Sequence, residues 1–114
     1  MKIVVLKFGG TSVGTIEKIK KVTDIIIEHK KKKNKVIVVS SAMSGVTNDL
    51  IKKSKQISNN FIDSEYDVLV SSGEQVACSL IAGRLNHKGF KSRSWLGWQI
   101  PIFTKGPYTN SRIQ

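Results

Sequence analysis

The stretch Ile3-Val4-Val5-Leu6-Lys7-Phe8-Gly9-Gly10-Thr11-Ser12-Val13-Gly14 decides the fold of the first part of the chain. Its first four residues are all apolar and predict a buried strand. A lysine, two adjacent glycines and a third glycine then lead into a helical pattern. Such a loop suits phosphate, because glycine lets N–H groups approach an anion, the helix offers its positive end and the lysine adds a charge. A kinase that handles a nucleotide is the first hypothesis.

The spacing of the loop matches neither of two well-known nucleotide motifs. Gly9 and Gly14 fit the glycines of G-x-x-x-x-G-K-[ST], but Thr15 and Ile16 follow where that motif needs lysine and a hydroxyl residue. The dinucleotide pattern G-x-G-x-x-G fails because Thr11 stands where its second glycine is required. On spacing alone, a phosphate-binding loop and a plain strand-to-helix turn both remain open.

The residues after the loop predict a βαβ unit. Apolar side chains recur every three to four positions and predict an amphipathic helix from about Thr15 to Lys33. The apolar run 36–39 predicts a second strand parallel to the first. A second polar loop, residues 40–49, leads into another helix. Both loops would leave the carboxyl edge of one parallel sheet, where open α/β sheets bind their ligands.

The rest of the chain is less regular. Residues 56–65 predict a surface connection, and residues 67–70 and 74–85 predict helices that Ser71-Ser72-Gly73 interrupts. Residues 87–89 are typical of a helix end. The remaining predictions are a third strand at 90–96, a turn at 97–99 and a short strand at 100–103.

Composition favours one globular domain. The chain has 114 residues, and a compact domain of this length buries roughly two thirds of its unfolded surface. No apolar run approaches the ~18 residues of a membrane helix, which favours the cytoplasm. Cys78 lies in an apolar stretch and has no second cysteine to pair with, so we expect a small buried side chain.

A net charge of +11 raises the question of nucleic-acid binding. Five lysines fall within residues 30–35, at the predicted end of the first helix, where cations complement the helix dipole and Asn34 suits a C-cap. The other basic residues are scattered, without an arginine-rich stripe or a pattern of stacking aromatics. The sequence therefore favours a solvated helix end over a nucleic-acid surface.

Three segments in order, residues 7–14, 40–48 and 71–76, resemble the N-terminal part of aspartate kinase. Gly97-Trp98-Gln99 adds a fourth similarity, and together they span nearly the whole chain. The resemblance implies the amino acid kinase superfamily, whose members phosphorylate a carboxylate or similar group with ATP and Mg²⁺. It also implies a three-layer α/β sandwich with a mainly parallel sheet, of which residues 1–114 would be the N-terminal, substrate-binding half.

The resemblance also implies roles for individual residues. Lys7 would contact the transferring phosphoryl group as the catalytic lysine, and the loop residues Gly9, Gly10 and Thr11 would hold nucleotide phosphate. Three further residues would bind L-aspartate, namely Ser41, Thr47 and Glu74, the last through the α-ammonium group. No metal ligand is predicted. Without the resemblance, Glu74 and Thr47 would suit ordinary positions near helix starts.

In the family, a following half supplies the nucleotide pocket, and regulatory ACT domains usually come after it; neither lies within residues 1–114. The stretch Lys105-Gly106-Pro107 also departs from the family, which tends to carry an acidic residue there. We therefore expect this chain alone to lack appreciable kinase activity, and its candidate partners are a C-terminal half or a second copy of the chain. The alternative hypothesis is a non-catalytic basic module that binds phosphate or nucleic acid.

Overall fold

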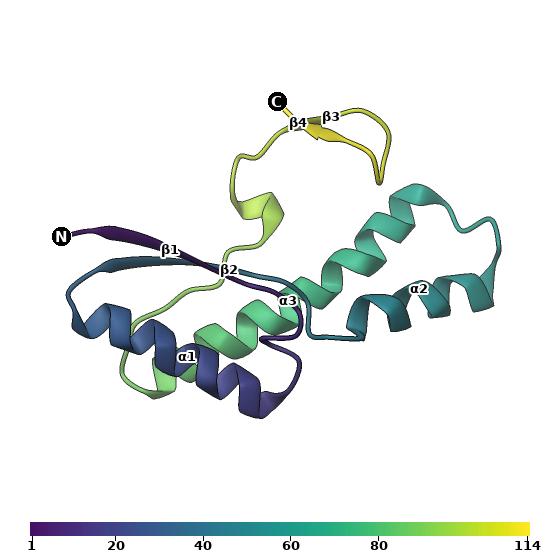
Figure 1. The fold of residues 1–114 in the computed structure, drawn as a ribbon. Helices are drawn as coiled ribbons and strands as arrows, with labels where there is room; N and C mark the ends of the chain where they lie inside the picture. Colours follow the sequence, from purple (N-terminus) through teal and green to yellow (C-terminus); the bar gives the residue numbers. More distant parts are fainter.

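The computed structural model describes all of residues 1–114. A parallel βαβ unit comes first, two further helices follow, and the chain ends in a small hairpin (Figure 1). In chain order the elements are β1 (Ile3–Phe8), α1 (Ile16–Lys31), β2 (Lys35–Ser40), α2 (Val46–Ile57), α3 (Asp63–His87), the 3-10 helix η1 (Gly97–Gln99), β3 (Thr104–Lys105) and β4 (Arg112–Ile113). No helix is long and apolar enough to cross a membrane.

The predicted βαβ unit is confirmed. Strands β1 and β2 pair in parallel, from Ile3 opposite Lys35 to Phe8 opposite Ser40. The hydroxyl of Thr15 caps α1 by accepting a hydrogen bond from the Lys18 N–H at 3.2 Å. The helix presents one buried stripe to the sheet, formed by Ile19, Val22, Thr23, Ile26 and Ile27. Helical and strand periodicity were therefore sufficient to predict these three elements.

The end of α1 differs from the prediction. The helix stops at Lys31, and the residue in the left-handed region is Lys33, with φ of 61°, rather than Asn34. A side chain with a Cβ is strained in that region, which glycine occupies freely. The turn into β2 thus carries a lysine at the position where glycine is usual.

Replacing Lys33 with glycine is expected to raise the free energy of unfolding by about 0.5–1 kcal/mol, because relief of the left-handed strain outweighs the added freedom of the unfolded chain. Urea denaturation of both proteins measures the change. Lys32 has φ of −76°, so Lys32→Gly is the matched control and is expected to destabilise. A Lys33→Gly protein that is less stable than the parent would contradict this interpretation.

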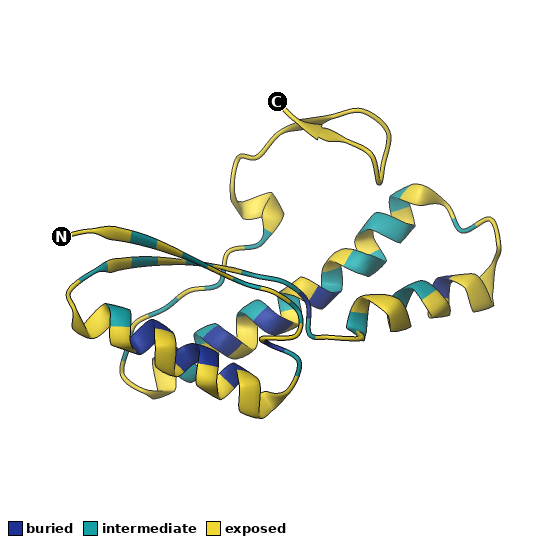
Figure 2. Cartoon of the chain, in the orientation of Figure 1, coloured by how far each residue is buried: buried dark blue, intermediate teal, exposed yellow.

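The core lies between the sheet and two helices that cover the same face (Figure 2). Helix α3 contributes Ile81 and Leu85, which join the buried stripe of α1, and the inward side chains of the strands pack against them. Arg84 links the helices: its Nη1 donates to the Lys20 carbonyl at 2.8 Å and to Asp24 Oδ1 at 2.8 Å, and it also contacts the hydroxyl of Thr23. This guanidinium holds α3 against α1.

The same contact predicts an acid dependence of stability. The hydrogen bond from Arg84 lowers the pKa of Asp24 below its usual value. A carboxyl with a depressed folded-state pKa stabilises the fold above its unfolded pKa, near 4, and loses that contribution as pH falls through the folded value. Melting curves between pH 6 and pH 2 should show a smaller acid-induced fall for Asp24→Asn than for the parent. Parallel curves for the two proteins would contradict the role of this pair.

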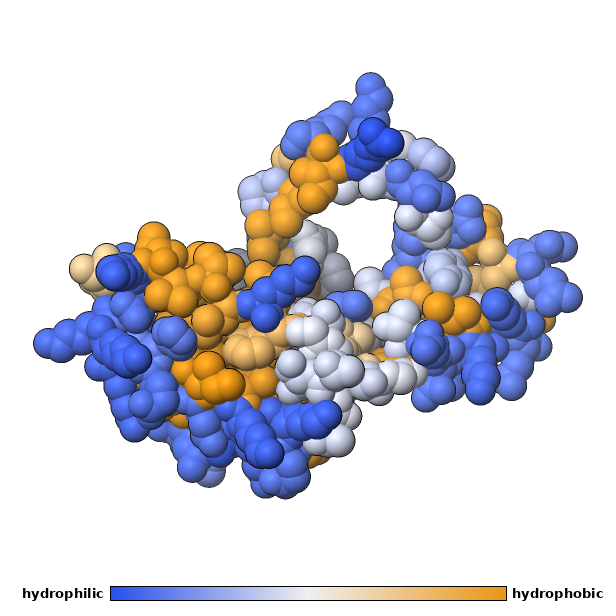
Figure 3. Space-filling view, in the orientation of Figure 1, coloured by the Kyte–Doolittle hydropathy of each residue, from blue (hydrophilic) through white to orange (hydrophobic).

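The other face of the sheet is open. Ile3, Val5, Ile37 and Val39 are 46–66% exposed, and Figure 3 shows an apolar surface over the sheet that β1 and β2 form. Only 12 residues are buried, and the accessible surface of 8411 Å² exceeds the roughly 6,200 Å² typical of a compact protein of this mass. The burial expected of a compact domain of this length is therefore not reached by these residues. The α/β class and the parallel sheet are confirmed. Residues 1–114 form two layers, the sheet and one layer of helices.

Helix α3 is continuous, so the predicted interruption at Ser71-Ser72-Gly73 is wrong. The hydroxyls of Ser71 and Ser72 donate to carbonyls three residues earlier in the helix, at Val68 and Leu69. Gly73 is buried within the helix. The sequence suggested a break here because serine and glycine have low intrinsic helix propensity. The contacts made by this part of α3 outweigh that low propensity.

The predicted strands at 90–96 and 100–103 are also wrong. Exposure alternates along residues 91–96, as in a strand, but the segment forms no ladder. Residues 97–114 are all exposed and end in the two-residue strands β3 and β4, which pair antiparallel. The hydrogen bond from the Thr109 N–H to Asp67 Oδ2, at 3.2 Å, joins this hairpin to α3. The predicted turn at 97–99 is η1.

Candidate functional site

The glycine-rich loop begins at the carboxyl end of β1, as predicted. Lys7 is exposed and belongs to the open face of the sheet, whereas its neighbour Phe8 packs against the core, since successive strand residues point to opposite faces. The N–H groups of Gly9, Gly10 and Thr11 make no hydrogen bond within the chain. Three unpaired N–H groups in a row, beside a lysine that forms no ion pair, give the loop a positive character.

The loop after β2 lies directly against the glycine loop. The Ser41 N–H donates to the Phe8 carbonyl at 3.0 Å, and the Ser44 N–H donates to the Gly10 carbonyl at 3.1 Å. A Cβ added at Gly10 would stand 3.1 Å from the Ala42 carbonyl oxygen, so a larger residue would push the two loops apart by a few tenths of an ångström. The two loops, although about thirty residues apart in sequence, thus form one surface, and Ser41 lies beside the end of β1.

Helix α3 packs against the second loop through Gly73. A Cβ at this position would stand 3.0 Å from the Ala42 Cβ and 3.2 Å from Val46 Cγ1. The buried stripe of α3 repeats every four residues from this contact, through Ala77, Ile81 and Leu85. Glu74 follows Gly73 and is exposed, without an ion-pair partner. The close contact therefore fixes the position of the Glu74 backbone relative to the two loops.

Thr47 lies in the first turn of α2, where it is exposed and makes no side-chain hydrogen bond. The N-cap of this helix is Gly45, with φ of 84°, so the cap comes from a left-handed glycine and not from Ser44 or Thr47. The Thr47 hydroxyl is therefore not committed to capping and stands free beside the N–H groups of the first turn of α2.

Burial raises the pKa of the Cys78 thiol, and the nearby Glu74 carboxylate raises it further. The thiol is half-buried rather than fully buried, and it is free, as expected. A raised pKa keeps the thiol in its neutral form, which is a poor nucleophile. Cys78 therefore fills space in α3 next to the candidate site and does not carry chemistry there.

The donor set of the two loops suits phosphate oxygens better than a metal ion. It consists of a lysine, hydroxyls and backbone N–H groups, which are hydrogen-bond donors. Mg²⁺ binds to oxygen ligands, commonly a carboxylate together with substrate phosphates. No group of three His, Cys, Asp or Glu side chains comes together in the structure.

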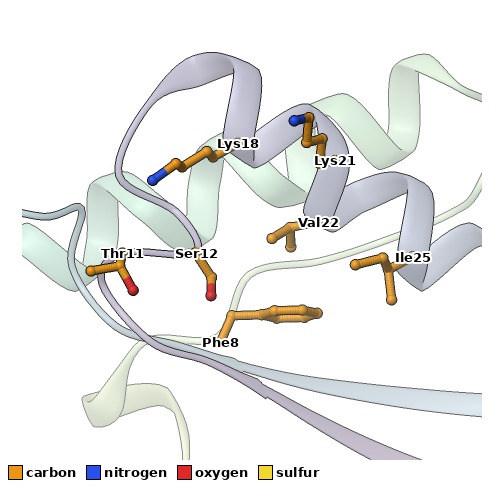
Figure 4. Close-up of a pocket in the computed structure, with 7 residues that line it drawn as sticks. All are labelled: Phe8, Thr11, Ser12, Lys18, Lys21, Val22 and Ile25. Carbon is orange, nitrogen blue, oxygen red and sulfur yellow. The ribbon is translucent and has the colours of Figure 1, made fainter.

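A shallow groove of about 400 Å³ lies on the helix side of the glycine loop (Figure 4). Figure 4 shows Lys18, Lys21, Val22 and Ile25 on α1, above Phe8 at the end of β1, with Thr11 and Ser12 of the loop beside them. The groove shares only Thr11 with the predicted site, and Lys7 belongs to the opposite face of the sheet. The sequence did not indicate this groove, because its lining combines the end of β1 and the loop with one face of α1.

The sequence of residues 2–113 matches the model of the amino acid kinase family. The chain belongs to the amino acid kinase family. Most of the residues to which the family resemblance assigns a role lie on or beside the two loops at the carboxyl edge of the parallel sheet.

Within the family, the chain is similar to aspartokinases. It is 49% identical over 113 residues to aspartokinase from Geobacillus stearothermophilus and 44% identical over 117 residues to aspartokinase from Rickettsia felis. These alignments cover 99% and 100% of the chain, but 28% and 29% of the two relatives. The resemblance to the N-terminal part of aspartate kinase is confirmed, and the chain spans less than a third of these relatives' length.

Solved structures agree with this assignment. Aspartate kinase from Synechocystis superposes with a TM-score of 0.73 at 42% identity, over 75% of this chain and 15% of that one. E. coli aspartokinase III, solved in complex with aspartate and ADP, gives a TM-score of 0.62 at 20% identity, over 78% of this chain and 30% of that one. The second similarity shows the fold alone.

Proposed function

We propose that residues 1–114 form the phosphate- and aspartate-binding part of an aspartate kinase. The observation that carries the proposal is the joined surface of two loops at the carboxyl edge of β1 and β2, where Lys7 stands beside three N–H groups without partners. Family membership and the aspartokinase relatives support the choice of substrate. The proposal keeps the cytoplasmic location expected from the sequence.

In the proposed reaction, a side-chain carboxylate oxygen of L-aspartate attacks the γ-phosphorus of ATP. The bond to the bridging oxygen breaks, which gives 4-phospho-L-aspartate and ADP, and this product would enter the synthesis of lysine, threonine, methionine and diaminopimelate. The carboxylate is already ionised at neutral pH, so the step needs no general base. Catalysis then depends on positioning and on neutralising phosphoryl charge.

Each predicted residue has a place in this scheme. Lys7 would neutralise charge on the transferring group, while the N–H groups of Gly9 and Gly10 and the loop residue Thr11 would hold nucleotide phosphate. Ser41 and Thr47 would bind the substrate carboxylates through their hydroxyls, and Glu74 would pair with the α-ammonium group. Mg²⁺ bound to the nucleotide phosphates would supply further charge neutralisation.

The 114-residue chain alone is expected to form no measurable aspartyl phosphate. The reason is that the proposed nucleotide-binding half lies outside residues 1–114, so the chain would contact the phosphates of ATP but not its adenine and ribose. A hydroxylamine assay for aspartyl phosphate, with purified chain, ATP and Mg²⁺, measures the activity. ATP-dependent product that Lys7→Gln abolishes would contradict the expectation.

A chimera tests the proposed function itself. Residues 1–114 replace the matching segment of Geobacillus stearothermophilus aspartokinase, to which they are 49% identical. We expect ATP-dependent aspartyl phosphate formation within about tenfold of the parent enzyme, since a related core context is retained. A folded chimera that binds ATP but does not phosphorylate aspartate would contradict the proposal. A second arm adds the relative's remaining segment as a separate chain, which tests whether two halves can assemble.

A further inference from the structure

A dense group of lysines lies at the edge of the sheet opposite the two loops. We call this group the lysine patch, and it consists of Lys2, Lys30, Lys31, Lys32, Lys33 and Lys35. The Lys35 N–H donates to the Lys2 carbonyl at 2.8 Å, which joins the chain start to the turn after α1. Figure 3 shows hydrophilic side chains at the end of the molecule where the N-terminus lies.

The lysine patch includes a shallow, open depression. A depression of about 570 Å³ is lined by Met1, Lys2, Lys32, Lys33 and Asn34. Three lysines from two separate segments therefore border one shallow depression. Lysines that share one depression can contact the same extended anionic ligand together.

The charge of the lysine patch is largely uncompensated. Glu28 forms an ion pair with Lys31, at 3.3 Å, and no other lysine of the patch has an acidic partner. The carboxyl end of α1 offers only about half a negative charge, against the five lysines of the patch that have no acidic partner. Lys33, one of these lysines, has a backbone in the strained left-handed region. Such a surface is stabilised when a polyanion binds to it.

The residue types restrict the kind of polyanion. The depression is lined by no aromatic side chain on which a base could stack, and by no arginine, whose planar guanidinium can bind one phosphate through two parallel hydrogen bonds. Lysine acts on phosphate as a point charge. We propose that the lysine patch binds a linear chain of phosphate groups without bases, inorganic polyphosphate, independently of the proposed kinase site.

The test measures binding of medium-chain inorganic polyphosphate to the purified 114-residue chain by calorimetry at several salt concentrations. The test variant is Lys32→Gln with Lys33→Gln. The matched control is Lys52→Gln with Lys53→Gln, which removes the same charge from an exposed pair on α2. Two lost phosphate contacts should lower the salt slope by about 1.4 and weaken binding about 25-fold at 0.1 M salt, taking a single-strand value per contact. The control should retain the parent affinity within about twofold.

Three outcomes would overturn the proposal. If polyphosphate does not bind at 0.1 M salt, it is not the ligand of this surface. An equal loss of affinity in both double variants would mean that binding depends only on net charge. Single-stranded RNA of equal charge that binds as tightly as polyphosphate would assign the surface to nucleic acid instead. Inorganic phosphate, as the monomer, is expected to bind far more weakly than the chain, because it cannot span several lysines.

Discussion

Exchanging Lys7 for glutamine in the chimera is expected to lower kcat about 100- to 1,000-fold, the usual effect of removing one preorganised donor from developing charge. Glutamine preserves much of the length and polarity of the side chain but removes its charge. Since Lys7 is exposed and forms no ion pair, its loss leaves no partner unpaired in the fold. Steady-state kinetics with ATP and aspartate, together with melting curves, measure the effect.

Lys35→Gln is the matched control for Lys7. Both lysines belong to the open face of the sheet, but Lys35 pairs with Ile3 at the opposite end, about 13 Å along the strands. The control removes the same charge from the same face and should leave kcat within about twofold. Equal losses in the two variants would mean that Lys7 acts only through net charge.

Valine at Gly73 is expected to lower the free energy of unfolding by about 2 kcal/mol, the scale of an overpacked contact. Its Cβ would stand 3.0 Å from the Ala42 Cβ and 3.2 Å from Val46 Cγ1, so α3 must move away from the second loop. That loop leads from Ser41 to Thr47, and its displacement should also raise KM for aspartate in the chimera. Urea denaturation and kinetics measure the two effects.

Gly83 provides the control on the same helix. It is exposed, and a Cβ there meets nothing within 4 Å. Gly83→Val should be neutral or slightly stabilising, because valine is a better helix former than glycine. If the two valine variants have equal stability, the contact between α3 and the loop is not tight, and the positioning of Glu74 loses its support.

The βαβ unit was predictable because local pattern and tertiary role agree there. Apolar runs form β1 and β2, and the stripe from Ile19 to Ile27 faces the core. Helix α3 was predicted in two pieces because Gly73 resembles a breaker in isolation. Glycine occupies this position because α3 packs closely against Ala42, and a contact between distant segments leaves no mark on the local sequence pattern.

In the C-terminal region, strands were predicted where the structure has none. Residues 90–96 and 100–103 carry apolar and aromatic side chains suited to strands, but a strand exists only where another strand pairs with it. No such partner is available among the described elements, and residues from 97 onward remain exposed. Strand pairing depends on distant segments, so these predictions failed although the residue types were suitable.

The candidate site was predicted in part. The glycine loop and the second loop do share one surface at the carboxyl edge of the sheet, as expected from parallel strands. The roles of Lys7, Thr47 and Glu74 came from the family resemblance and stay predictions. Sequence alone did not indicate that Gly10 and Gly73 serve as contact points for the second loop, because each contact joins segments far apart in the chain.

The most direct test of the central claim is a crystal structure of the chimera with ADP and L-aspartate. The account predicts the terminal phosphate of ADP near Lys7 Nζ and the N–H groups of Gly9 and Gly10, within about 3 Å of at least one donor. It also predicts the α-ammonium group of aspartate at the Glu74 carboxylate. Nucleotide and aspartate bound away from the two joined loops would contradict the account.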